Sequence, residues 1–395
     1  GMCLSAESLP EPRKYAAGFA ATGVSPGGPG AAVVVRGLGL AVGLAHLALL
    51  AACLRLLFPE RPLRQVVGLA IGAFLPCMLY LHQYPANEPL VAMLSTAGIL
   101  ATLHLLRQEA PRLRGHAMLG LLLGLALLAK VSALLLLPPV LGALAARALF
   151  GDPRWRARRL AGAALSTATL AVTCGWYYAR VWQRFGTPFV GGWDARRGMG
   201  WWMDPGYRTI DDFLRFGRAF TAPLFAGFGG VWDGLYVTLW GDGLLSGRIS
   251  TAQLPPWWSP SLMSAALLLA VVPAAAVLAG VVAALFRWTR RPDAINGVLV
   301  WLAILVLLSV LSMAAGVPAV AADKASYGLL ALVPLCAFAA RALGAVAERR
   351  RWLGAVLAGT LGVWALASFS TYWIDAASGK ARLIKGTAEV QRGDR

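Results

Sequence analysis

The fold is decided by the stretch WYYARVWQRFGTPFVGGWDARRGMGWWMDPGYRTIDDFLRFGRAF, residues 176–220, which opens the one long polar interruption in an otherwise apolar sequence. The interruption runs to Trp258 and holds six of the eighteen acidic residues, namely Asp194, Asp204, Asp211, Asp212, Asp233 and Asp242. Eight of the fifteen tryptophans also lie between Trp182 and Trp258. Rings beside carboxylates suit the recognition of sugars or amphipathic lipids better than a plain connection between helices. The stretch therefore predicts a functional head.

Composition predicts what carries this head. Hydrophobic residues make up 58% of the 395 residues and charged residues 14%, against about 45–50% and 25% in ordinary soluble domains. These values predict an all-α polytopic membrane protein. The net charge of +18 does not favour nucleic acid as a partner, because the basic residues form short clusters between apolar runs, as in membrane proteins.

The apolar runs predict about ten transmembrane helices, since each covers or nearly covers about 30 Å of hydrocarbon. They are residues 37–57, 66–83, 89–106, 116–129, 132–149, 160–182, 261–286, 295–316, 325–345 and 352–373. The chain then divides into an outer loop or tail (1–34), a transmembrane bundle (35–183), a large outer loop with interfacial helices (184–258), a second bundle (259–374) and an outer tail (375–395).

Basic residues set the orientation, because Lys and Arg are retained on the cytoplasmic side. With the first run directed inward, the inner turns hold fifteen arginines and the short outer turns hold only Lys130 and Lys324. The fifteen are Arg61, Arg64, Arg107, Arg112, Arg114, Arg154, Arg156, Arg158, Arg159, Arg287, Arg290, Arg291, Arg349, Arg350 and Arg351. The same asymmetry requires residues 116–149 to form two spans, and it places the large loop outside.

The short outer turn QYPANEP, residues 83–89, carries a carboxylate at the membrane boundary. Such a group needs a cation, a metal or hydrogen-bond donors to offset its desolvation. The local alternative is a helix start in which Asn87 is the cap, Glu88 favours the positive helix end and Pro89 lies in the first turn.

Lys130 and Lys324 have two interpretations as well. Either ammonium group suits a lipid-linked phosphate, and either side chain alternatively extends to the membrane interface. In the large loop, residues 210–225 place apolar side chains at roughly helical spacing and predict a helix in the interface plane. The alternative for its tryptophans is an interfacial aromatic belt.

Several segments together resemble the multispan glycosyltransferases of the GT-C superfamily, in particular family 39, which contains protein mannosyltransferases and aminoarabinose transferases. They are the helix–turn–helix around the Asn87-Glu88 turn, GLLLGLALLAKVSALLLLPP (120–139), WYYARVWQRFGTPFVGGWD (176–194) and DKASYGLLALVPLCAFAAR (323–341). The resemblance covers roughly residues 35–345.

This resemblance implies transfer of a sugar from a polyprenyl-phosphate carrier to an acceptor on the outer face. In the family, an acidic residue of the first outer loop is the base, and an acidic residue of the second loop supports catalysis or a divalent metal such as Mg or Mn. Glu88 matches the second position. Residues before Arg36 offer only Glu7 and Glu11, in a different context, so we expect an upstream span and part of the first loop to be missing.

The chemistry assigns the remaining candidates. A departing phosphate needs positive charge and an acceptor needs a carboxylate. Catalytic groups are Glu88, also the possible metal ligand, and Asn87. Candidates for the donor phosphate are Lys130, Lys324, Arg184 and Arg208, and for the sugar or acceptor Asp194, Asp204, Tyr207, Asp233, Trp240 and Asp242. We expect Glu88 and both lysines to converge beneath the aromatic loop.

Two other functions stay open. A transporter or flippase for lipid-linked saccharides would share this outer surface but would need polar residues along the full membrane depth. A catalytically incomplete remnant fits the missing first-loop acid. For an enzyme, the expected partners are the bilayer, the polyprenyl-phosphate sugar and a lipid, glycan or protein acceptor. The expected location is the bacterial inner membrane, with the large loop outside.

Overall fold

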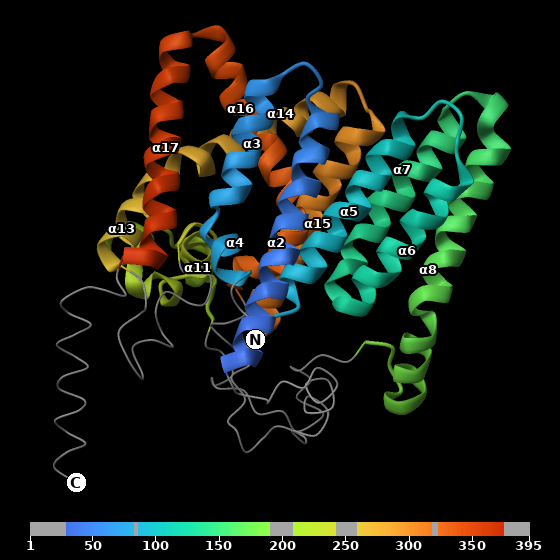
Figure 1. Cartoon of the computed structure of the whole chain (residues 1–395), viewed down its shortest axis with the longest axis horizontal. Helices are drawn as coiled ribbons and strands as arrows, with labels where there is room; N and C mark the ends of the chain where they lie inside the picture. The colour runs from blue at the N-terminus through green and yellow to red at the C-terminus, as the bar shows by residue number, and fades with distance from the viewer. Residues whose placement is uncertain (1–28, 83–85, 190–207, 242–258, 318–322, 375–395) are drawn as a thin grey trace.

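The computed structural model describes residues 29–82, 86–189, 208–241, 259–317 and 323–374, and within these ranges the chain is helical without a β-strand (Figure 1). The first half contains α2 (Pro29–Leu57), α3 (Pro62–Phe74), α4 (Pro76–Leu81), α5 (Glu88–Arg107), α6 (Leu113–Ala129), η2 (Val131–Leu136), α7 (Leu137–Phe150), η3 (Pro153–Trp155) and α8 (Arg156–Phe185). The second half contains α9 (Ile210–Leu214), α10 (Arg218–Thr221), η5 (Pro223–Phe228), α11 (Val231–Trp240), α13 (Pro260–Leu269), α14 (Val271–Arg290), α15 (Ala294–Gly316), η7 (Ala325–Ala331), α16 (Leu332–Arg349) and α17 (Arg351–Ile374). The predicted all-α polytopic membrane protein is confirmed.

Seven helical segments in the described ranges are long and apolar enough to cross a membrane, fewer than the ten predicted. They are Val33–Leu57, Glu88–Arg107, Val131–Phe150, Ser261–Arg290, Ala294–Gly316, Ala325–Arg349 and Arg351–Thr371. The other three predicted runs fall short for different reasons. Residues 66–83 are interrupted, α6 has only 17 residues, and serine, threonine and glycine dilute the apolar part of α8.

Pro76 causes the interruption between α3 and α4. A proline disfavours the α conformation in the residue before it, and Leu75 is accordingly extended, at φ −60° and ψ 116°. The run 66–83 therefore ends one helix and starts a second, very short one. By contrast, the predicted division of residues 116–149 is confirmed, because Lys130 is extended (φ −162°, ψ 135°) between α6 and η2.

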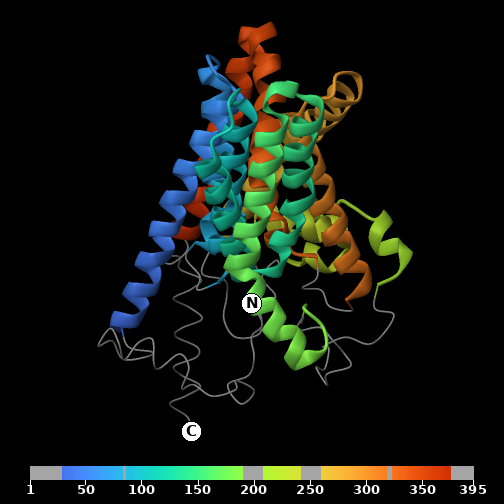
Figure 2. The same ribbon diagram turned by 90° about the vertical axis from the view of Figure 1, so that its right-hand side faces the viewer.

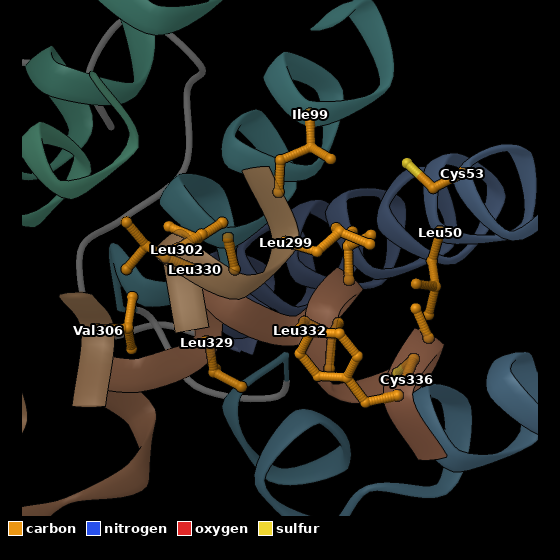
Figure 3. Packing of buried hydrophobic residues seen from close by; sticks show 14 of the residues in the cluster. Leu50, Cys53, Ile99, Leu299, Leu302, Val306, Leu329, Leu330, Leu332 and Cys336 are labelled. Carbon is orange, nitrogen blue, oxygen red and sulfur yellow. The ribbon is translucent and has the colours of Figure 1, made fainter. Parts of the chain in front are cut away.

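The core lies where α2, α5, α15, η7 and α16 meet (Figure 3). Leu50, Ile99, Leu299, Leu332 and Cys336 are all fully or almost fully buried there. Apolar side chains gain little from leaving lipid for a protein interior, so close packing rather than water exclusion holds such helices together. The core is therefore held together by the complementary shapes of its side chains, and this packing fixes the positions of the helices relative to one another.

The arginine-bearing turns all lie at one end of the bundle in both views, and α11 lies toward the other (Figures 1 and 2). At the arginine end, Arg64 binds Glu348 through two bonds of 3.0 and 2.6 Å, and Arg61 reaches the same carboxylate at 3.1 Å. Arg159 donates to three backbone carbonyls. The arginine-bearing turns thus gather at one end, as the alternation of the spans predicts, and the orientation of that end in the membrane stays a prediction.

Candidate functional site

The turn before α5 and the break after α6 meet at the end opposite the arginines. Lys130 Nζ lies 2.7 Å from Glu88 Oε1. The amide of Asn87 donates to the carbonyl of Ala129, at 3.1 Å, and so ties the two segments together. Glu88 is buried and Lys130 is half-buried, so this is a carboxylate–ammonium pair sheltered from solvent.

Local sequence explains how Glu88 reaches this position. Pro89 lies in the first turn of α5, and Glu88 is the first helical residue, where the positive end of the helix dipole favours a carboxylate. Asn87 occupies the N-cap position of α5, as the local alternative predicts, and its carbonyl accepts from the amide of Val91 at 3.0 Å, but its side chain makes no capping bond. The side chain instead reaches across to α6.

The start of η7 completes this side of the site. The ring of Tyr327 lies beneath Lys130, with 4.8 Å from Nζ to the ring centroid, which is a cation–π contact. Lys324 precedes η7 and is buried, and its carbonyl accepts from the amide of Tyr327. Glu88 and the two lysine-bearing segments therefore gather in one region, as the sequence predicted.

A second ion pair, which the sequence reasoning missed, lies beside the first. Asp323 is fully buried, and its Oδ2 lies 3.3 Å from Arg208 Nη2. Burial raises the pKa of Asp323 to about 7, although Arg208 and Lys324 act in the opposite direction. The available signal is that Asp323 directly precedes Lys324 at the start of the apolar run 325–345.

The two ion pairs are linked through η7 and α11. Tyr327 lies within electrostatic range of both Glu88 and Asp323. On the other side, Thr238 of α11 accepts from the amide of Ala325 at 2.9 Å and donates to the carbonyl of Gly234 at 2.7 Å. Residues 208–241, called the outer segment below, are thus hydrogen-bonded through α11 to η7, the 3-10 helix that contains Tyr327.

The predicted ligand roles of Arg208, Asp233 and Trp240 do not agree with their positions. The charge of Arg208 is matched by buried Asp323, so it is not an open phosphate ligand. Asp233 is buried and accepts from the amides of Gly217 and Ala219, at 3.0 and 2.8 Å. Trp240 is buried edge-to-face against Trp364, with centroids 5.7 Å apart. Asp233 and Trp240 hold the outer segment together.

Other candidates lie elsewhere. Arg184 is exposed in the last turn of α8, stacked on Phe185 at 5.5 Å, and no contact of this helix with α5 or η7 is observed among the main packing pairs. Asp194, Asp204, Tyr207 and Asp242 lie outside the described residues. Their predicted roles stay predictions.

The predicted interfacial helix over residues 210–225 is also wrong as a continuous element. It is divided into α9 and α10, because Gly217 adopts φ 127°, a conformation that suits glycine. Ile210 and Leu214 remain strongly exposed, at 73% and 74%. Apolar side chains are therefore presented outward, but on a short helical turn.

Comparison with known proteins gives a partial structural likeness. No family model matches the chain, and no curated protein matches it. Solved structures of an oligosaccharyltransferase from the archaeon Archaeoglobus fulgidus align with it. The apo form has TM-score 0.45 and 13% identity over 88% of this chain. The complex with an inhibitory peptide and a dolichol-phosphate has TM-score 0.48 and 13% identity over 91%. The chain spans less than half of those proteins, 45% and 46% of their lengths. At this level the likeness assigns no family.

Proposed function

We propose that the chain is a GT-C-type membrane glycosyltransferase that moves a sugar from a polyprenyl-phosphate carrier to an acceptor on the outer face. The observation that carries this proposal is the sheltered Glu88–Lys130 pair, 2.7 Å apart, at the non-arginine end of an apolar bundle. A buried ion pair contributes little to stability once desolvation is counted. A charged pair at a membrane boundary, where desolvation is costly, points to use in chemistry. The family 39 resemblance of the surrounding segments supports the same function.

The donor half of the reaction needs a cation. Lys130 is the group in place, since its ammonium is mobile enough to leave one acceptor for another and Tyr327 supports it from below. When the carrier phosphate binds, Lys130 moves from Glu88 to the phosphate oxygens. As the bond between the sugar carbon and the phosphate oxygen breaks, the ammonium stabilises the negative charge left on the polyprenyl phosphate.

The acceptor half needs a base. Glu88, released from Lys130, takes the proton of the acceptor hydroxyl or amine as that atom bonds to the sugar carbon. Glu88 thus takes the role that the family 39 resemblance gives to an acidic residue of the first outer loop. The proton ends on the carboxylate, the electron pair of the broken bond ends on the phosphate, and charge balances across the site. Asn87, fixed by its bond to Ala129, holds the turn in register.

The described residues do not fit a resident divalent cation at this site. No group of three or more His, Cys, Asp or Glu side chains is found among them. Glu88 is engaged by Lys130, and Asp323 by Arg208. No step is therefore derived through Mg or Mn.

The test is transfer by the purified full chain in liposomes that contain a polyprenyl-phosphate sugar. We expect Glu88→Gln and Lys130→Gln each to reduce carrier consumption about a hundredfold or more, the usual effect of removing a general base or a charge-stabilising group. Glu348→Gln is the matched control, because Glu348 is also paired with arginine but at the opposite end. It should leave the rate unchanged.

Two outcomes contradict the proposal. Undiminished transfer by Glu88→Gln would remove Glu88 from the chemistry. Movement of intact carrier across the bilayer, without consumption of its sugar, would favour the flippase instead. The bacterial inner membrane, with the aromatic loop outside, is part of the same proposal.

A further inference from the structure

A cavity of about 970 Å³ lies between α7, the end of α14 and the first half of α15. Its volume is at the upper end of the range of small-molecule sites, about 300–1,000 Å³. Its lining includes none of Glu88, Lys130, Lys324 and Asp323, and no step of the proposed reaction uses it. The cavity therefore needs an explanation of its own.

The cavity is polar at one end and apolar along its depth. Arg147, Trp288 and Asp293 line the part at the arginine-rich end. From there the lining follows α7 back to Pro138 and α15 forward to Leu305. The twelve residue-to-residue steps from Pro138 to Phe150 correspond to about 18 Å of helix, which is close to half of the roughly 30 Å hydrocarbon thickness. This is the depth of one lipid leaflet.

Arg147 supplies the polar recognition. Its Nε is buried and has no hydrogen-bond partner in the described part of the chain, although a buried donor without an acceptor is costly. Its position in the last turn of α7 suits the helix dipole but leaves this donor unsatisfied. A phosphate oxygen would satisfy it.

Asp293, the acidic residue of the lining, is already engaged. Its carboxylate accepts from the backbone amide of Asn296 at 2.8 Å and from the Asn296 side chain at 2.5 Å. The Asn296 side chain in turn accepts from Arg341 at 2.9 Å. Arg147 is therefore the basic residue of the lining whose Nε is left for a ligand, and it favours an anionic headgroup over one that carries an ammonium.

Aromatic rings close the mouth. Trp288 and Trp301 meet edge-to-face, with centroids 5.9 Å apart. A side chain at Gly297 would come within 3.1 Å of Trp288 Nε1, so the indole lies directly over α15. Tryptophans at this depth are characteristic of the headgroup level.

We infer that this cavity binds an anionic glycerophospholipid, with its phosphate on Arg147 and an acyl chain along α7 and α15. Cationic pockets between transmembrane helices on the predicted cytoplasmic side are known to accept such headgroups. The length of the cavity, its gradient of polarity and its unsatisfied cation all match one leaflet-resident lipid.

Native mass spectrometry of the full chain, purified from vesicles of equal phosphatidylglycerol and phosphatidylcholine, tests this inference. We expect bound phosphatidylglycerol to exceed phosphatidylcholine, and Arg147→Gln to lower that ratio about tenfold, the effect of losing one charge-assisted hydrogen bond. Arg350→Gln, an exposed arginine at the same end, is the control and should keep the ratio.

A second variant tests the apolar part. Gly142 lines the cavity and has no atom within 4 Å of an added Cβ, so Gly142→Leu should fill the groove and displace lipid of either headgroup. Gly359→Leu, at an exposed position of α17 with equally open space, is its control. Brominated phosphatidylglycerol should quench wild-type fluorescence more than that of Trp301→Phe.

Equal binding of the two lipids, an unchanged ratio in Arg147→Gln, or no loss in Gly142→Leu would overturn the inference. So would a change of oligomeric state in Gly142→Leu, since that result would assign the groove to a second copy of the chain.

Discussion

At the scale of single residues, the site consists of two pairs of opposite charges, each sheltered from solvent. Glu88 and Lys130 form one pair, and Asp323 and Arg208 form another. Sequence reasoning found the first pair because the outer turns are almost devoid of other charges. Asp323 was not predicted, because it lies outside the long loop that holds most of the candidate aspartates and its partner Arg208 is distant in sequence. Partners distant in sequence cannot be found from spacing alone.

Asp323 gives a pH prediction. Its pKa is raised from 3.8 to about 7 in the folded state, so the folded state holds a proton that the unfolded chain has released. Stability from this group is then complete below about pH 4 and is lost as the pH rises through about 7. We expect the thermal unfolding midpoint to fall between pH 5 and pH 8.

The variant Asp323→Asn isolates this contribution. Its amide stays neutral at every pH, like the protonated carboxyl, so its stability should change less between pH 5 and pH 8 than that of the wild type. Asp211→Asn, at an exposed pair with Arg215, should keep the wild-type pH dependence. An equal slope in wild type and Asp323→Asn would contradict the assignment.

At the scale of elements, close helix contacts depend on glycines that the sequence showed without explaining. GLLLG, residues 120–124, resembled a family segment, and the structure gives it a packing role. A Cβ at Gly120 would lie 2.2 Å from the carbonyl oxygen of Ser166 in α8, and one at Gly124 would lie 2.6 Å from Thr173. Small residues four apart let two membrane helices approach closely.

Gly120→Ala should therefore destabilise the fold by about 1–3 kcal/mol, the range for overpacking a tight contact. Gly175→Ala in α8 is a matched control, since nothing lies within 4 Å of its added Cβ. It should be neutral or slightly stabilising, as alanine favours helix over glycine. Denaturation of the purified variants in detergent provides the comparison. Equal midpoints for the two variants would mean that α6 and α8 are not held by this contact.

Element boundaries show where sequence reasoning works in this chain. The division at Lys130 was predicted, because the charge asymmetry of the turns constrains the number of crossings. The interruption at Leu75 and the break at Gly217 were not. In both places apolar periodicity continues while the backbone turns, at an extended residue before Pro76 and at a glycine with φ 127°. The hydrophobic pattern of a sequence indicates which residues are buried, but it does not show where a local change in φ and ψ interrupts a helix.

At the scale of the whole molecule, chemistry is divided between two ends. The turns that hold the fifteen arginines lie at one end of the bundle, and α11 lies toward the other (Figure 1). This division was predictable because insertion acts on the sequence itself. The number of full-length spans was not predictable, because apolar runs such as those of α4 and α6 form helices too short to cross the membrane alone.

Orientation is testable by cysteine labelling. The four described cysteines are buried, so in a Cys3→Ser background an impermeant maleimide should report introduced sites. Arg184→Cys should label in intact cells, and Arg154→Cys only after permeabilisation, because both side chains are exposed at opposite ends. The reverse pattern would invert the proposed topology and place the Glu88 site inside.

The contact between Gly234 and Asp323 has a consequence for any exchange of parts. A Cβ at position 234 would lie 2.3 Å from Asp323 Oδ2, so the backbone of α11 fits directly against the carboxylate that also holds Arg208. The outer segment and η7 therefore depend on each other structurally and have to be exchanged together. A chimera that imports residues 208–241 without residues 323–331 would contain Arg208 without its partner Asp323, and Gly234 without the close contact that requires a glycine. Recombination in this architecture has to move both, or neither.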